Sequence, residues 1–123
     1  MPDLTYTPIR VPRRPLVFLA ESVKSPPFSD AARKEAGALL AQVQEGTELG
    51  MPRSRPLPVI GPRCHELRIN DENVTWRIIY RIDLAVIVVP GLFAKKSRTL
   101  PNRMIETCRK RLAAYDAQTK GKH

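Results

Sequence analysis

The middle of the chain alternates short apolar runs with polar breaks. The runs 64–69, 74–82 and 84–89 are rich in Val, Ile, Trp and Tyr, and the breaks are residues 70–73 and Asp83. Short runs of β-branched and aromatic residues between polar residues are typical of strands. The pattern therefore predicts three consecutive strands that pair as an antiparallel meander.

Side chains alternate between the two faces of a strand, so pairing the first two runs assigns each residue to a face. One face collects apolar residues, and the other brings Glu66, Arg68 and Arg77 together. The third run is apolar on both faces, which predicts a central strand that is covered on both sides. The residues assigned to the apolar face are Leu67, Ile69, Trp76 and Ile78.

Apolar residues at helical spacing lie before and after these runs. Ser29 or Asp30 can cap a first helix that Gly46 ends, and Pro101 suits the first turn of a second helix. A short apolar run at 16–19 follows several prolines, which favours an edge strand. The two helical stripes are Ala32, Ala36, Leu39, Leu40 and Val43, and then Ile105, Cys108, Leu112 and Tyr115.

Together these elements predict an α+β fold. A small antiparallel β-sheet is expected to pack with an N-terminal helix or helical hairpin and with a C-terminal helix. A chain of 123 residues with 42% hydrophobic residues can bury a modest core without disulfide bonds. We expect residues 1–13 to be an extended arm, residues 14–117 to form a single domain, and residues 118–123 to be a disordered tail.

The chain is strongly basic, with a net charge of +9 and a sequence pI of about 10.2. A small domain with this charge is expected to meet a polyanion, most often nucleic acid, although a soluble protein that is merely basic has the same composition. No segment approaches membrane-spanning length, and the run at 16–20 is too short for a signal peptide. Cys64 and Cys108 stand far apart, which suggests free thiols in a reducing compartment. We therefore expect a cytoplasmic protein with no membrane partner.

The sequence contains no spacing typical of a metal site, a phosphate loop or a nucleophilic triad. Its two histidines, His65 and His123, stand alone. We therefore expect no metal, no cofactor and no small-molecule ligand. What remains is a concentration of cations on and after the predicted sheet, with Glu66 and Tyr80 beside them: Arg68, Arg77, Arg81, Lys95, Lys96 and Arg98.

Such a set of cations is suited to RNA cleavage without a metal. A ribose 2′-hydroxyl attacks the neighbouring phosphorus, and the site must supply a base, an acid and cations that stabilise the phosphorane. Arginine stabilises charge because it does not deprotonate in practice, whereas a lysine among other cations can exchange a proton. A passive nucleic-acid-binding patch has the same composition, so the residues alone leave both interpretations open.

Further cations lie outside the predicted sheet. Arg53, Arg55 and Arg63 are spaced along a loop rich in Pro and Gly, and Arg103 lies on the predicted C-terminal helix. Spaced cations of this kind contact the backbone of RNA. They are also typical of a solvated surface, so both interpretations stand at this point.

Three segments in order resemble the HigB branch of the RelE/ParE toxin superfamily. They are Glu66-Leu67-Arg68, then Trp76-Arg77-Ile78-Ile79-Tyr80, and then Leu92-Phe93-Ala94-Lys95-Lys96-Ser97-Arg98-Thr99-Leu100-Pro101, which precedes a basic helix. The resemblance extends over residues 28–116. It implies a RelE/ParE-like fold and the toxin of a type II toxin–antitoxin pair, an endoribonuclease that cuts mRNA on the ribosome. The implied partners are the ribosome, mRNA and a cognate helix-turn-helix antitoxin.

The resemblance also implies roles for individual residues. Arg77 is expected to stabilise charge on the phosphate, and Arg68 to position it. Lys95 or Lys96 is expected to exchange a proton or to contact the phosphate. The implied supporting residues are Glu66, as a weak base or as the partner that holds Arg68, together with Tyr80 and Arg98.

Other interpretations remain open. A toxin of the same fold can act without catalysis on a protein target such as a topoisomerase, and a decayed phage-derived protein can retain RNA binding alone. Arg77 and Glu66 can form a simple cross-strand ion pair, and Tyr80 can belong to the core. Pro90-Gly91 interrupts the third apolar run just before the lysines, which predicts a bulge or a bend there.

Overall fold

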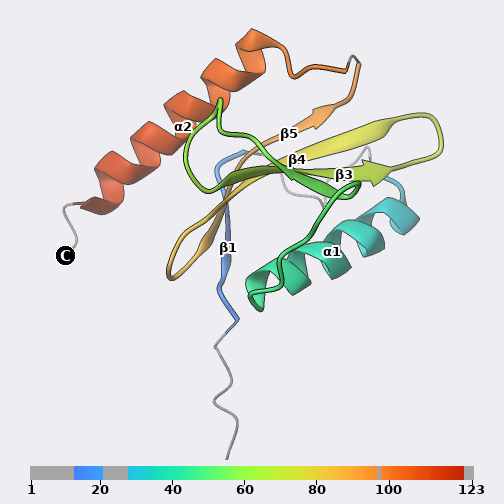
Figure 1. The fold of residues 1–123 in the computed structure, drawn as a ribbon, viewed down its shortest axis with the longest axis horizontal. Helices are drawn as coiled ribbons and strands as arrows, with labels where there is room; N and C mark the ends of the chain where they lie inside the picture. The colour runs from blue at the N-terminus through green and yellow to red at the C-terminus, as the bar shows by residue number, and fades with distance from the viewer. Residues whose placement is uncertain (1–12, 21–27, 97, 121–123) are drawn as a thin grey trace, which may run out of the picture.

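The computed structural model describes residues 13–20, 28–96 and 98–120. They form one five-stranded sheet, ordered β1-β5-β4-β3-β2, with a helix on each face (Figure 1). This is the predicted α+β fold, and its N-terminal side has the single helix α1 within the described residues. In chain order the elements are β1 (Leu16–Phe18), α1 (Asp30–Gln44), β2 (Ser54–Pro56), β3 (Cys64–Asn70), β4 (Thr75–Ile82), β5 (Ile87–Ala94) and α2 (Asn102–Lys120).

The strands β3, β4 and β5 form the predicted antiparallel meander, and β2 adds to it as an antiparallel edge strand. The other edge differs from the prediction, because β1 pairs parallel with β5, with Leu16 opposite Ile87 and Phe18 opposite Val89. Parallel neighbours require a long crossover, and the chain between β1 and β5 contains α1 and the other three strands. The sheet is therefore mixed rather than wholly antiparallel.

The strand β5 is central and buried on both faces, as predicted, but it begins later than the apolar run. Leu84 lies in the turn before it and is 98% exposed. The ladder then continues through Pro90-Gly91: Ile79 lies opposite Gly91, whereas Arg81, two residues on, lies opposite Val88. Three residues of β5 therefore match two residues of β4, which is the bulge that the Pro-Gly pair predicts.

Helix α1 covers the apolar face of the sheet. Its buried residues are the predicted stripe Ala32, Ala36, Leu39, Leu40 and Val43. They form one hydrophobic cluster with the inward residues of β3, β4 and β5, and Leu67, Ile69 and Ile78 are fully buried within it. The assignment of faces made from strand alternation is confirmed for these residues.

The start of α1 is tied to the turn between β3 and β4. The Ser29 hydroxyl accepts a hydrogen bond from the backbone N–H of Ala32, and the Ser29 N–H donates to Asp71 Oδ2 at 3.0 Å. Trp76 Nε1 donates to the same oxygen at 3.1 Å. The hydrogen bonds from Ser29, and then that from Trp76, hold the pKa of Asp71 well below its usual range. Asp71 therefore joins the N-cap of α1 to the hairpin.

Helix α2 packs on the opposite face, over the bulge in β5. Gly91 allows this approach, because a Cβ atom there would lie 2.5 Å from the Phe93 ring and 3.1 Å from Cys108 Sγ. Arg111 Nη1 also donates to the Pro90 carbonyl oxygen at 2.8 Å. Cys64 and Cys108 are buried free thiols, and burial raises the pKa of Cys108 to about 12.

The structure describes only part of the predicted N-terminal arm and of the predicted C-terminal tail. The arm predicted at 1–13 lies outside the described residues except for Arg13, which pairs with Glu45 at 2.6 Å. The tail predicted at 118–123 is wrong for residues 118–120, which continue α2. The remaining residues, 121–123, lie outside the described part of the chain.

Candidate nucleic-acid interface

Three arginines converge on one buried carboxylate on the α2 side of the sheet. Glu66 is 0% exposed, and its Oε1 accepts from Arg55 Nε at 3.2 Å and from Arg68 Nε at 3.1 Å. Its Oε2 lies 3.5 Å from Arg77 Nε. Register explains the convergence, because Arg55 lies opposite Glu66 and Arg68 lies opposite Arg77. We refer to Arg55, Glu66, Arg68 and Arg77 as the arginine cluster.

The arginine cluster carries excess positive charge, because three guanidinium groups share one carboxylate. Burial is the main effect that lowers the pKa of Arg77. Glu66 opposes that shift, whereas the positive charges of Arg55 and Arg68 lower the pKa of Arg77 further. The three cations therefore repel one another, and their excess positive charge attracts a further anion to the cluster.

Arg77 lies inside the protein and not at its surface. Its side chain is 1% exposed, and its Nη2 donates to the carbonyl oxygen of Arg98 at 3.1 Å. The structure does not place the Arg77 guanidinium where it could touch a phosphate, because its side chain is closed off from solvent, and the expected charge stabilisation by Arg77 stays a prediction. Arg77 instead links Glu66 to the segment between β5 and α2.

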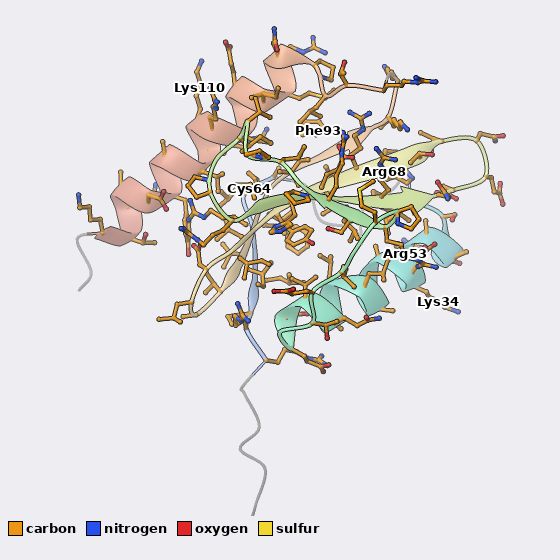
Figure 2. All side chains as sticks on the ribbon, in the orientation of Figure 1. Lys34, Arg53, Cys64, Arg68, Phe93 and Lys110 are labelled. Atoms are coloured by element: carbon orange, nitrogen blue, oxygen red, sulfur yellow. The ribbon has the colours of Figure 1, made fainter. Side chains whose placement is uncertain are left out.

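A cavity of about 310 Å³ opens beside the arginine cluster. Arg68 lines it from β3, and Lys95 lines it from the end of β5, where the Lys95 N–H donates to the Thr75 carbonyl oxygen at 2.7 Å. Arg53 lies at its side and pairs with Glu35 of α1 at 3.2 Å; Figure 2 shows Arg53 and Arg68. We call this the basic cavity, and its full lining is Glu35, Pro52, Arg53, Arg68, Asn70, Thr75 and Lys95.

Lys96 and Arg98 are exposed and do not line the basic cavity. Arg103 is also exposed, at the start of α2. The structure thus brings together Arg68 and Lys95 from the predicted catalytic set, and Lys96 follows Lys95 along the chain. Arg98 contributes its backbone to the arginine cluster through Arg77, and among the residues that the structure describes no side-chain hydrogen bond or ion pair of Arg98 bears on its predicted supporting role.

Arg81 is part of an internal ion-pair network with Asp83 and Asp116. It donates to both oxygens of Asp83 at 2.8 Å, and to the two oxygens of Asp116 on α2 at 2.7 and 3.0 Å. The Asp116 hydrogen bond, more than the bond to Asp83, holds the pKa of Arg81 above its usual range, although burial opposes it. Arg81 therefore fastens α2 to the sheet, and its predicted RNA contact stays a prediction that this geometry does not support.

Arg63 and Tyr80 also lie away from the basic cavity. Arg63 donates to the Ile82 carbonyl oxygen and pairs with Asp83, next to Arg81. Tyr80 is buried on the α1 face, where its hydroxyl bonds Ser54 at 2.7 Å and its ring stacks on His65. Strand alternation turns Tyr80 to the face opposite Arg77, so the structure does not bring it to the predicted site, and its supporting role stays a prediction.

A family comparison places the chain among known proteins. Residues 27–113 match the family model described as Phage derived protein Gp49-like (DUF891). The chain belongs to this Gp49-like family. The family is toxin-like and occurs in toxin–antitoxin systems, which agrees with the coarse part of the resemblance found in the sequence. No curated protein and no solved structure matches the chain significantly.

The matched range of this Gp49-like protein contains α1, the whole arginine cluster and the basic cavity. No group of three metal-ligating side chains occurs within the described residues. No helix in the same part of the chain has the length and apolar character needed to cross a membrane.

Sequence reasoning missed three polar residues of the basic cavity in this Gp49-like protein, as well as Pro52. Asn70 and Thr75 flank the turn between β3 and β4, and Thr75 Oγ1 donates to Asn70 Oδ1 at 3.2 Å. Their pairing follows from hairpin register, so the sequence held a usable signal for them. Glu35 comes from the distant helix α1, and nothing near it in the sequence indicates that it meets Arg53.

Proposed function

We propose that this Gp49-like protein is the toxin of a type II toxin–antitoxin system, and that it cleaves mRNA on the ribosome as the HigB branch of the RelE/ParE superfamily does. The observation that carries the proposal is the meeting of Arg68 and Lys95 in one basic cavity beside an arginine cluster with excess positive charge. We expect this activity in the cytoplasm, because that is where ribosomes translate mRNA.

In this proposal the scissile phosphate occupies the basic cavity. The RNA 2′-hydroxyl attacks phosphorus and passes its proton to solvent water. The bond to the 5′-oxygen breaks and that oxygen gains a proton, which leaves a 2′,3′-cyclic phosphate on one fragment and a 5′-hydroxyl on the other. Arg68 stabilises the added charge on the phosphorane oxygens. Lys95 donates the proton to the departing 5′-oxygen, and Lys96 lies next to it along the chain. Glu66 and Arg77 hold Arg68 in place and touch no substrate.

The test is controlled expression in a bacterial host, followed by mapping of mRNA 5′ ends. The wild-type protein should arrest growth and produce new 5′ ends at codon-spaced positions, and the Lys95→Ala variant should produce none. A small helix-turn-helix protein encoded in the neighbouring reading frame should restore growth when it is co-expressed. Growth arrest without new 5′ ends would contradict cleavage and would indicate a protein target such as a topoisomerase.

The burial of Arg77 favours a second candidate, an RNA-binding protein that does not cleave. With Arg77 turned inward, Arg68 is the one arginine of the cluster that lines the basic cavity. The phage derivation of the family is compatible with this decayed function. Binding of RNA in vitro, together with normal growth at high expression, would support this candidate against the toxin.

A further inference from the structure

Arg55 and Arg68 share one acceptor and keep donors for a ligand. Both donate from Nε to the same oxygen of Glu66, so their guanidinium groups lie next to each other. Their side chains are 31% and 30% exposed. Within the described residues neither arginine donates a hydrogen bond from an Nη atom. Each therefore presents its Nη donors outward, while Glu66 fixes the direction of the planar group.

The position of Arg55 differs from that of Arg68. Arg68 lines the basic cavity, whereas Arg55 lies outside it on the edge strand β2. Because the two arginines contact one carboxylate oxygen, the positive surface continues from the cavity across Arg68 to Arg55. A ligand with a single phosphate in the cavity leaves the outward donors of Arg55 unused.

We propose that Arg55 and Arg68 together bind a second phosphate, next to the phosphate in the basic cavity, so that the ligand is an oligonucleotide with consecutive phosphates and not a mononucleotide. This inference rests on the proposed function only for the nature of the ligand, a single-stranded nucleic acid. The second phosphate supplies the negative charge that the arginine cluster lacks. Glu66 is the positioning residue that aims both guanidinium groups.

The test measures binding of thymidine oligomers to the full-length protein by NMR titration. These oligomers have no 2′-hydroxyl, so cleavage cannot interfere and a protein without nuclease activity gives the same answer. The Arg55→Gln variant should bind a trinucleotide with two phosphates about tenfold more weakly than wild type, because a hydrogen bond to a charged group is lost. Its affinity for a dinucleotide with one phosphate should change less than twofold.

Salt dependence supplies a second readout. The slope of log affinity against log salt for the longer oligomer should fall by about 0.7 in Arg55→Gln, as expected for one lost contact to a single strand. Arg55→Lys should keep the slope while binding more weakly. The matched control is Lys110→Gln, which removes one charge from the outer side of α2 (Figure 2) and should leave both values unchanged. Equal loss for both oligomers, or no loss for either, would overturn the proposal.

Discussion

Arg77 Nη2 donates a hydrogen bond to the carbonyl oxygen of Arg98, 3.1 Å away. The same guanidinium group lies 3.5 Å from Glu66 Oε2. One buried side chain therefore joins β4, β3 and the segment that leads from β5 into α2. This arrangement ties the segment before α2 to the sheet, while the Thr75 carbonyl oxygen holds the backbone of Lys95.

Replacement of Arg77 should lower the free energy of unfolding, because its side chain is buried and has its contacts inside the protein. The Arg77→Met variant leaves a buried carboxylate with fewer cations, and breaking a buried pair in this way destabilises a protein by about 3 kcal/mol. Urea unfolding at neutral pH measures the change. The control is Arg68→Met in the same cluster, where solvent screens the pair and the loss should stay within about 1 kcal/mol. Equal stability of the two variants would contradict the internal role of Arg77.

Replacement of Arg68 should reduce activity while the fold persists. Loss of one preorganised donor to a transition-state oxygen lowers a rate by about 10²-fold, and Arg68→Gln should show a fall of this size in mRNA cleavage. Arg68→Lys should recover part of the rate, because it keeps the charge but loses the planar fork. Quantified primer extension, with circular dichroism to confirm folding, checks both. Cleavage at the wild-type rate by Arg68→Gln would rule out the basic cavity as the reaction site.

Two glycine-to-alanine substitutions form a matched pair. One is at Gly91, where α2 packs on the sheet, and the other is at Gly37, on the exposed side of α1. Gly91→Ala should destabilise by about 2 kcal/mol, because the new methyl group overlaps the Phe93 ring and presses on Cys108. Gly37→Ala, in the exposed middle of α1 with open space around it, should stabilise by about 0.5–1 kcal/mol. Thermal unfolding of both variants tests whether the two substitutions change the free energy of unfolding in opposite directions. A neutral Gly91→Ala would show that α2 does not press on the bulge.

The hydrogen bonds to Asp71 predict sensitivity to acid. They hold the pKa of Asp71 in the folded state below the unfolded value of 3.8. A depressed folded pKa contributes stability above the unfolded pKa, and this contribution is lost as pH falls below about 4. The free energy of unfolding of Asp71→Asn should therefore vary less than that of wild type between about pH 5 and pH 2. The neighbouring exposed Glu72→Gln is the control, and it should keep the wild-type pH profile.

Local sequence patterns predicted most of the fold, because they depend on neighbours along the chain. The stripe from Ala32 to Val43 faces the core, and the alternation in β3 and β4 placed Glu66, Arg68 and Arg77 on one face. The Pro90-Gly91 bulge followed in the same way. The parallel pairing of β1 with β5 was not predictable from neighbours along the chain, because α1 and three strands lie between these two segments in the sequence.

The sequence by itself determined which residues share a face of the sheet, since the period of a strand fixes that choice. Only the tertiary structure decided which of these cations meet solvent. Arg77 and Arg81 are both cations on β4, and the sequence does not distinguish between them. In the folded protein Arg77 is buried against the carbonyl oxygen of Arg98, and Arg81 is bound by the carboxylates of Asp83 and Asp116. The physical reason is that a guanidinium group is available to an anion only when distant segments have not already supplied its acceptors.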